Sequence, residues 1–214
     1  MRVKGMSAYV IWDMNGTLID DVAVAVKAVN DGFFKVGIKP TFISEYRENM
    51  DMPIYKYYEK HADLNKIPMS FFSKEYLDGY ERYADLIKEG ENALFCVREL
   101  HKRGVFQCVV SSFEQGRLLA LSDRFGFTPF MDGVYGAGDV ACVGKTERGI
   151  SVLREKGVSP ENALVVGDMA HDFEMACACG ARCLLYSKGH QSERALLKCG
   201  APVINDLREV LNYV

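Results

Sequence analysis

The sequence predicts an α/β fold in which a doubly wound parallel sheet carries an inserted α-helical unit. Two observations predict the sheet: short apolar runs that do not alternate with polar residues, and helical patterns in the intervals between the later runs. A third observation, a long stretch without a convincing strand, predicts the insertion. At 214 residues, of which 49% are hydrophobic, the chain is long enough to bury such a core.

Four apolar runs are the predicted strands of the sheet. Each is apolar throughout, as expected of a strand that is covered on both faces. In chain order they are Ala8 to Trp12, Val105 to Val110, Ala163 to Val166, and Cys183 to Tyr186. A fifth, shorter strand is predicted at Val134 and Tyr135.

Helical patterns fill two of the intervals between these strands. The apolar spacing predicts helices over Leu118 to Phe125 and over Thr146 to Lys156. Gly104, Gly157 and Gly180 fall where a helix should stop before the next strand, which is a common position for glycine. This alternation is the pattern of a doubly wound sheet.

The segment from Val22 to Glu89 breaks the alternation and predicts several helices instead. Its helical patterns are interrupted at Gly37, Pro40, Pro53 and Pro68. It also holds half of the aromatic residues of the chain. A small helical unit needs such side chains for a core of its own, and stacking against a substrate is the alternative role.

Composition and charge argue against several classes of partner. The 26 basic and 29 acidic residues leave a formal charge of −3, so no footprint for a nucleic acid or an acidic membrane is visible. No apolar run approaches the roughly 20 residues of a membrane span, and the first residues lack the apolar stretch of a signal peptide. Seven cysteines, mostly within apolar runs, fit reduced thiols. We therefore expect a cytoplasmic protein, monomer or homodimer, with a small soluble partner.

The first predicted strand ends at a carboxylate. Asp13 follows Trp12 and opens the motif Asp-Met-Asn-Gly-Thr at the carboxyl edge of the sheet, where open α/β folds bind ligands. An exposed aspartate at this edge suits a nucleophile. Gly16 lets the backbone turn tightly, so that its amide and the neighbouring amides point at an oxyanion. A strand exit without chemistry is the alternative for this motif taken alone.

Two further motifs offer hydroxyl groups and a fixed positive charge. Ser111 and Ser112 follow the second predicted strand and would share the edge of Asp13 if the two strands are neighbours. A helix N-cap is the alternative role of Ser112. Lys145 opens a predicted helix, where its ammonium group could reach the nucleophile or a phosphate, with a solvent-exposed lysine as the alternative.

The third predicted strand also delivers carboxylates to the edge of the sheet. Asp168 follows this strand in Gly-Asp-Met-Ala-His-Asp, and Asp172 lies four residues later. Unpaired, these groups would repel each other and Asp13, whereas a hard divalent cation such as Mg²⁺, which takes oxygen ligands, removes the conflict. The alternative role of Asp172 is to cap the following helix.

Together, these four ordered motifs resemble those of the haloacid dehalogenase superfamily. The resemblance covers essentially the whole chain. Met1 to Asp21 and Gly90 to Val214 resemble its Rossmann-like core, and Val22 to Glu89 resembles its helical cap. The run from Phe127 to Gly136 is similar to the phosphoglycolate phosphatase and β-phosphoglucomutase branch.

The resemblance implies a division of labour among these residues. Asp13 would attack phosphorus, while Asp13, Asp168 and the backbone carbonyl of Asn15 would hold Mg²⁺, with Asp172 in direct contact or behind these ligands. The expected phosphate-binding residues are Ser111, Ser112, Lys145, Asn15 and Gly16. Phosphoryl transfer asks mainly for in-line positioning and for neutralisation of charge on the equatorial oxygens, which such groups supply.

Asn15 departs from the pattern of the family. Phosphatases of the superfamily carry a second aspartate there, which protonates the leaving group and later activates water, and asparagine cannot exchange a proton near neutral pH. Three accounts stay open: another proton donor, an activated substrate that needs none, or a mutated position. His171 is the candidate donor nearest in sequence, and His61 and Lys56 could reach the site only from a closed cap.

The expected function is that of a magnesium-dependent phosphatase. It would act on a small phosphorylated metabolite through an aspartyl-phosphate on Asp13, and slowly, because general acid/base help is worth ~10²–10⁴-fold. The alternatives are a catalytically silent phosphate-binding or regulatory protein on the same fold, a phosphonate hydrolase and a phosphomutase. Asn15 motivates the first of these alternatives.

Overall fold

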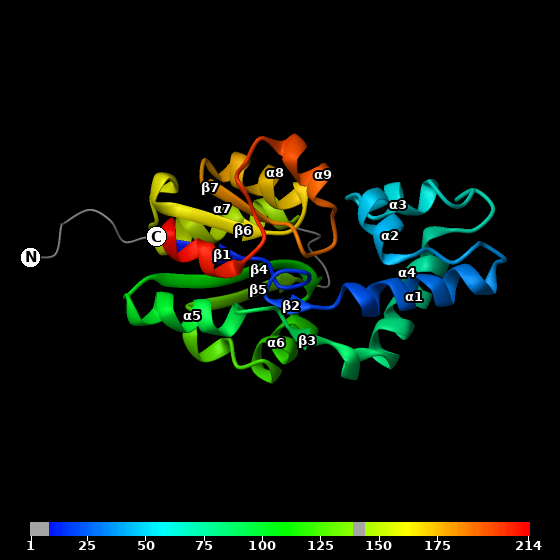
Figure 1. The fold of residues 1–214 in the computed structure, drawn as a ribbon, viewed down its shortest axis with the longest axis horizontal. Helices are drawn as coiled ribbons and strands as arrows, with labels where there is room; N and C mark the ends of the chain where they lie inside the picture. Colours follow the sequence, from blue (N-terminus) through cyan, green and yellow to red (C-terminus); the bar gives the residue numbers. More distant parts are fainter. Residues whose placement is uncertain (1–8, 139–143) are drawn as a thin grey trace, which may run out of the picture.

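A six-stranded parallel sheet forms the centre of the molecule, in a computed structural model that describes residues 9–138 and 144–214. The strand order is β5-β4-β1-β6-β7-β8, and every neighbouring pair is parallel (Figure 1). The strands are β1 (Tyr9–Trp12), β4 (Phe106–Glu114), β5 (Gly133–Ala137), β6 (Ala163–Gly167), β7 (Arg182–Tyr186) and β8 (Val203–Ile204). The predicted fold class is confirmed.

Helices cover both faces of this sheet, as the unbroken apolar strands predict. They are α5 (Ala93–Lys102), α6 (Gln115–Arg124), α7 (Lys145–Lys156), α8 (Ala170–Cys179) and the short α9 (Glu193–Leu196). In β1, Val10 and Trp12 join the hydrophobic cluster on one face, while Tyr9 and Ile11 join the cluster on the other. Successive residues of a strand point to opposite faces, so β1 contributes to both clusters.

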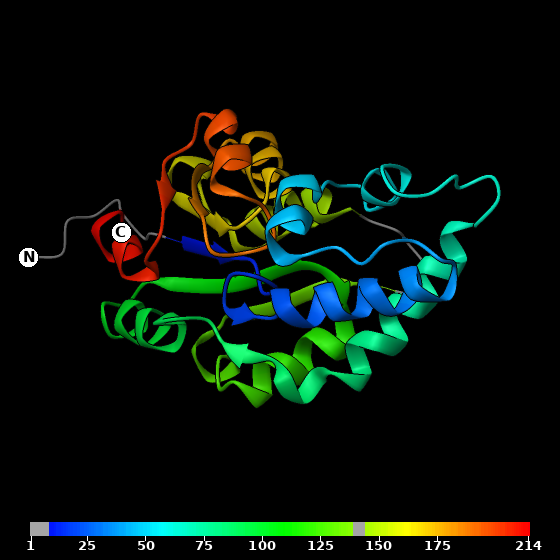
Figure 2. The ribbon, with the colours of Figure 1, turned by 45° about the vertical axis from the view of Figure 1, so that its right-hand side comes forward.

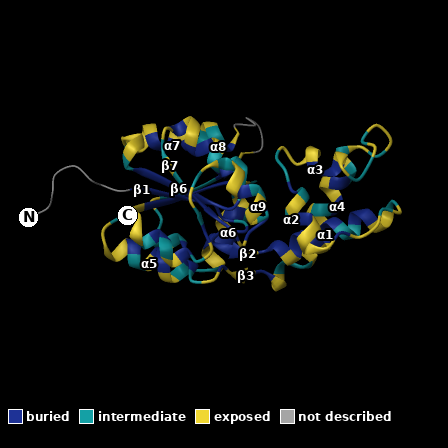
Figure 3. Ribbon diagram, turned by 45° about the horizontal axis from the view of Figure 1, so that its top comes forward, coloured by how far each residue is buried: buried dark blue, intermediate teal, exposed yellow. Residues whose placement is uncertain are grey.

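Four more helices form the cap, which lies beside the carboxyl edge of the sheet (Figures 1 and 2). They are α1 (Val22–Lys35), α2 (Ile43–Asn49), α3 (Tyr55–Glu59) and α4 (Met69–Arg82). Their buried side chains form a separate hydrophobic cluster that is rich in aromatic residues, such as Phe33, Tyr57 and Phe72. The predicted aromatic core of the helical unit is therefore confirmed, and Figure 3 shows it as a buried interior beneath exposed outer faces.

Short elements complete the fold. An antiparallel pair, β2 (Ile19–Asp20) and β3 (Lys88–Glu89), joins the cap to the core. The 3-10 turns are Ala84–Leu86, Thr128–Phe130, Pro160–Asn162, Leu197–Cys199 and Leu207–Asn212. Gly157 and Gly180 end α7 and α8 with φ of +64° and +69°, as predicted. Within the described ranges, no helix is long and apolar enough to cross a membrane.

The structure corrects three details of the prediction. β4 continues past Val110 to Glu114 because its pairing with β5 resumes after an irregularity in the ladder. Ser112 therefore lies in the strand, and Glu114 caps α6 in its place, accepting two backbone amides of that helix. β3 lies inside the segment for which the sequence predicts helices alone, and β8 is not predicted at all. Each of these strands has only two residues. Ala8 lies outside the described residues.

Candidate active site

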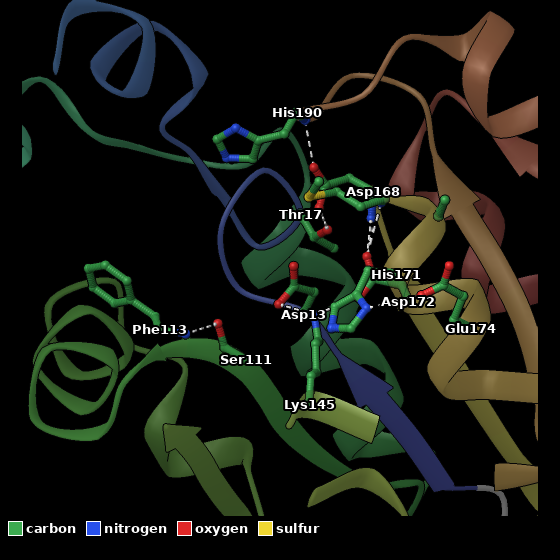
Figure 4. A network of polar contacts seen from close by, with 12 residues as sticks. Asp13, Thr17, Ser111, Phe113, Lys145, Asp168, His171, Asp172, Glu174 and His190 are labelled. Carbon is green, nitrogen blue, oxygen red and sulfur yellow. Dashed lines mark hydrogen bonds and ion pairs between the residues drawn. The ribbon is translucent and has the colours of Figure 1, made fainter. Parts of the chain in front are cut away.

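The predicted catalytic carboxylates meet at the carboxyl edge of the sheet. β1 pairs with β6, and Trp12 lies opposite Val166. The backbone amide of Asp13 donates to the carbonyl of Val166 at 2.8 Å, so Asp13 and Asp168 leave adjacent strands side by side. Figure 4 shows both carboxylates at the same edge of the sheet, with the side chain of Lys145 beside Asp13.

Lys145 is a buried cation between two carboxylates. Its Nζ lies 2.7 Å from Oδ1 of Asp13 and 2.5 Å from Oδ1 of Asp172. Burial opposes the charged ammonium group, but the carboxylates of Asp13 and Asp172 outweigh burial and raise the pKa of Lys145. The side chain is therefore a permanent positive charge held against the proposed nucleophile, and it is not the solvent-exposed lysine of the alternative interpretation.

Three buried carboxylates form a site whose chemistry fits a hard cation. Ligand oxygens of Asp13, Asp168 and Asp172 all lie within 4.8 Å of one another. Burial and the neighbouring carboxylates raise the pKa of Asp168 to about 7, and burial raises the pKa of Asp13 despite the opposing effect of Lys145. One lysine does not neutralise three carboxylates, so a divalent ion with oxygen ligands would complete the charge balance.

The two oxygens of Asp172 are both engaged by groups of the protein. Oδ1 accepts from Lys145, and Oδ2 accepts from the backbone amides of Asp168 at 3.1 Å and Met169 at 3.0 Å. These amides lie at the start of α8, so Asp172 caps that helix while it positions Lys145. Because its oxygens are engaged in this way, Asp172 is better placed to position Lys145 and Asp168 than to bind a metal ion directly.

Asp168 is held so tightly that its neighbours have to be glycines. Its Oδ1 accepts from the hydroxyl of Thr17 at 3.0 Å, and its Oδ2 accepts from the backbone amide of His190 at 2.5 Å. A Cβ atom at Gly16 or Gly189 would lie 2.3 Å or 2.2 Å from Oδ2 of Asp168. The carboxylate thus has one preset position beside Asp13.

Of the predicted phosphate-binding residues, all but Gly16 line one cavity, together with Asp13 and Asp172. This cavity has a volume of about 360 Å³, and Asp13, Asn15, Ser111, Ser112 and Lys145 all contribute to its wall. The size falls within the usual range for small-molecule sites. The Oγ atom of Ser111 accepts from the backbone amide of Phe113 at 3.2 Å, and the hydroxyl group stays free to donate to a ligand.

The side chain of Asn15 contacts a buried carboxylate, Asp21, that the sequence reasoning missed. Its Nδ2 donates to Oδ2 of Asp21 at 2.8 Å and to the hydroxyl of Tyr80 at 2.9 Å. The hydroxyl of Tyr80 in turn donates to Oδ2 of Asp21 at 2.7 Å. The amide of Asn15 is therefore fixed by a buried acid at the start of α1 and by a tyrosine of the cap.

Asp21 also binds a buried histidine that the sequence reasoning missed. Nε2 of His190 lies 3.1 Å from Oδ1 of Asp21, and Nδ1 lies 2.9 Å from the hydroxyl of Tyr46. Burial opposes the imidazolium, but Asp21 outweighs burial, so the pKa of His190 rises to about 9. The pKa of Asp21 falls in spite of burial, because His190 and the amide of Asn15 favour the carboxylate. The pair is an ion pair at neutral pH.

The proton donors considered from the sequence are spread over the site and the cap. His171 lines the cavity, and its Nδ1 lies 3.3 Å from Oε2 of Glu174. His61 packs against the rings of Phe33 and Tyr57 in the cap and is absent from the cavity wall. Lys56 is exposed on α3 and does not line the cavity either. The structure therefore brings only His171 of the three to the site.

A parallel α/β core, a helical cap and an acidic cluster at the carboxyl edge of the sheet define a capped Rossmann-like protein with a candidate active site between core and cap. The chain belongs to the haloacid dehalogenase-like hydrolase family, whose model matches residues 10–186. The predicted resemblance, and with it the prediction of a hydrolase, are confirmed.

Relatives of known name agree with this assignment. A phosphoglycolate phosphatase of Pseudomonas fluorescens is 23% identical over 94% of this chain and 78% of its own length. Phosphoglycolate phosphatase 1 of Pseudomonas aeruginosa is 25% identical with the same coverage. A haloacid dehalogenase-like hydrolase from Streptococcus pneumoniae has the same fold, with a TM-score of 0.84 and 20% identity over 96% of this chain and 97% of its own. A predicted phosphatase from Clostridium acetobutylicum has a TM-score of 0.82 at 18% identity and covers 98% of both chains.

Proposed function

We propose that this protein is a magnesium-dependent phosphatase that acts on a small phosphorylated metabolite through an aspartyl-phosphate on Asp13. The observation that carries the proposal is the contact of Asp13 with Lys145, 2.7 Å apart, at the wall of a cavity and beside Asp168. The phosphatase names of the relatives support it. We retain 22–89 as the cap, 1–21 with 90–214 as the core, and the cytoplasm as the location.

In the first displacement, a carboxylate oxygen of Asp13 attacks phosphorus and the bond to the leaving-group oxygen breaks. Lys145 and the hydroxyl of Ser111 neutralise and orient the phosphoryl oxygens. The backbone amide of Gly16, expected to point at an oxyanion, instead donates to Oδ1 of Asp21 at 2.8 Å. Ser112 lines the same wall and is the further hydroxyl donor. In-line positioning by fixed groups is the main demand of this reaction.

Asp13, Asp168 and the backbone carbonyl of Asn15 would hold Mg²⁺, with Asp172 orienting Lys145 and the start of α8 behind them. The bound ion supplies charge neutralisation for the transferring phosphoryl group. The buried oxygen cluster, whose ligand atoms lie within 4.8 Å of one another, is the observation that fits this ion.

In the second displacement, water attacks the phosphoryl group and breaks its bond to Asp13. Asn15 cannot take the proton of this water, which predicts that the second displacement is slow. A catalytically silent role would leave the charged cluster of Asp13, Lys145 and Asp168 without a use, so the enzyme is the better-supported proposal.

The test is magnesium-dependent release of phosphate from a panel of phosphorylated compounds that includes phenyl phosphate. The matched control is Asp13→Asn, which keeps the size of the side chain and removes the nucleophile. Release that requires both Mg²⁺ and Asp13 supports the proposal. Release by neither protein above the rate in buffer, for every compound, would refute it and favour the silent phosphate-binding role.

A further inference from the structure

We propose that the natural substrate is a phosphate monoester of an uncharged aromatic alcohol, an inference that rests on the proposed phosphatase function. Two independent features of the chain carry it. Within the described residues, the part of the cavity that the cap contributes is apolar and aromatic and has no cation. Position 15, two residues after the nucleophile, carries asparagine in place of an acid. The apolar cap selects an uncharged leaving group. The missing acid selects a leaving group whose oxygen has a low pKa and departs without a proton.

The cap side of the cavity offers rings and thioethers to the group that leaves. Tyr58 and Tyr76 line it together with Met50, Met52 and Leu77, and the core adds the ring of Phe113. Aromatic rings bind other rings by offset or edge-to-face packing, and methionine adapts to an aromatic edge. Ser73 and the tyrosine hydroxyls are the polar groups of the cap that line this cavity within the described residues.

The positive groups of the cavity all belong to the core. Within the described ranges, Lys145, His171 and His190 are the residues of the cavity wall that can carry positive charge. Lys145 is engaged by carboxylates at 2.7 Å and 2.5 Å, and both ring nitrogens of His190 have partners. His171 lies 3.3 Å from Oε2 of Glu174. In the part of the chain that the structure describes, none of the cap lysines and arginines lines the cavity. A second anionic group held among the cap residues would therefore have no cap cation beside it, which is costly.

Two cap cations follow a residue of the cavity wall in sequence, Lys74 after Ser73 and Arg47 after Tyr46. Lys74 pairs with Asp78 at 2.6 Å. Arg47 is engaged in another way. Its guanidinium group donates to the backbone carbonyls of Ser187 and Gln191, so it docks the cap on the loop after β7. Its Nε is buried without a hydrogen-bond partner, but the residue does not line the cavity. This side chain fastens the cap to the core and leaves the cavity without a carboxylate-binding group.

The chemistry at Asn15 selects the same class of leaving group. The amide of Asn15 is turned towards Asp21 and Tyr80, and it has no proton to give to a leaving oxygen. A phenolate with a pKa near ~10 departs without a proton far more readily than an alkoxide, whose pKa lies near the ~15.7 of water. An aryl phosphate therefore needs no general acid, whereas an alkyl phosphate does.

The first experiment compares kcat/KM for phenyl phosphate, butyl phosphate and phosphoglycolate in the presence of Mg²⁺. We expect phenyl phosphate to exceed phosphoglycolate by at least about 100-fold, the order expected when a charge enters an apolar site without a partner. Equal or better use of phosphoglycolate would overturn the inference while leaving the phosphatase proposal intact. No Asp13-dependent release from any of the three would refute the phosphatase proposal itself.

The second experiment uses substituted phenyl phosphates whose leaving groups differ in pKa. Without a general acid, log kcat/KM should fall steeply as the pKa of the leaving group rises, and Asn15→Asp should make this dependence shallower. A shallow dependence in the unmodified chain would show that another group protonates the leaving oxygen, and it would overturn the argument from Asn15. A purely structural role of Asn15 would lower all rates and leave the slope unchanged.

The third experiment gives the cavity the cation that it lacks. Leu77 lines the cavity and is 39% exposed, so Leu77→Arg is expected to leave the fold intact. This variant should raise kcat/KM for phosphoglycolate relative to phenyl phosphate by about 10-fold or more, while the matched Leu77→Met variant leaves the ratio unchanged. An unchanged ratio in Leu77→Arg, with normal activity on phenyl phosphate, would count against the assignment of this region to the leaving group.

Discussion

Asn15→Asp is the substitution whose outcome the structure predicts in most detail. Nδ2 of Asn15 lies 2.8 Å from Oδ2 of Asp21, which is buried. An aspartate at position 15 places a second carboxylate at this distance. Two unit charges at that separation repel by about 6 kcal/mol at an effective dielectric constant of about 20, which corresponds to roughly four pKa units. The two carboxyl groups are therefore expected to share one proton at neutral pH.

A shared proton next to the cavity is the general acid that the unmodified chain lacks. We expect Asn15→Asp to raise kcat for butyl phosphate by ~10²-fold or more, within the usual value of general acid/base catalysis. The effect on phenyl phosphate should be much smaller. The measurement is steady-state phosphate release from both substrates, with circular dichroism to check the fold.

Asp21→Asn and the double exchange Asn15→Asp with Asp21→Asn are the matched controls. The single Asp21→Asn variant has no carboxyl group at either position and should gain nothing on butyl phosphate. The double variant has one carboxylate, at position 15, without the neighbouring carboxylate that holds a proton there, so it should lose most of the gain. A folded Asn15→Asp protein that hydrolyses butyl phosphate no faster than the unmodified chain would refute this reasoning.

Three further predictions concern the charges around the site. Lys145→Met leaves two buried carboxylates without their cation, so it should abolish turnover. It should also lower the free energy of unfolding, measured in urea, by about 3–5 kcal/mol. A loss below about 1 kcal/mol would contradict the role of this ion pair. The raised pKa of Asp168, about 7, means that protons compete with Mg²⁺, so titration calorimetry should show the affinity falling up to tenfold per pH unit below about pH 7, and a flat profile would argue against Asp168 as a ligand. The pKa of His190 is raised from 6.5 to about 9, so its stabilising effect is complete below pH 6.5 and is lost as the pH rises through about 9. His190→Gln should remove this part of the pH dependence of the free energy of unfolding, measured in urea without metal. An unchanged pH profile would count against the ion pair with Asp21.

Much of the fold followed from local patterns in the sequence. The apolar runs that became β1 and β6 are buried on both faces, and hydrophobicity alone identifies such strands. Because Asp13 and Asp168 come directly after these two strands, the approach of their carboxylates could be expected before the structure was known. The same reasoning could not find β8, which has two residues and too little pattern to detect.

The partners of Asn15 could not be predicted in this way. Asp21 and His190 lie 169 residues apart in sequence, and their contact depends on how the loop after β7 docks on α1 and α2. Asp21 follows the first motif by only a few residues and could have been weighed as a nearby acid, although it was missed. His190 lies in a segment without any pattern that indicates a buried charge. Contacts made by tertiary docking leave no periodic trace in the chain.

Covalent labelling of Asp13 tests the central claim most directly. The protein is mixed with phenyl phosphate and Mg²⁺, quenched in acid, and analysed by peptide mass spectrometry, with Asp13→Asn as the control. Because Asn15 leaves the second displacement without a general base, we predict that one phosphoryl group accumulates on the peptide that contains Asp13 and is absent from the control. Steady release of phosphate with no adduct on Asp13, or an adduct on another residue, would contradict the account.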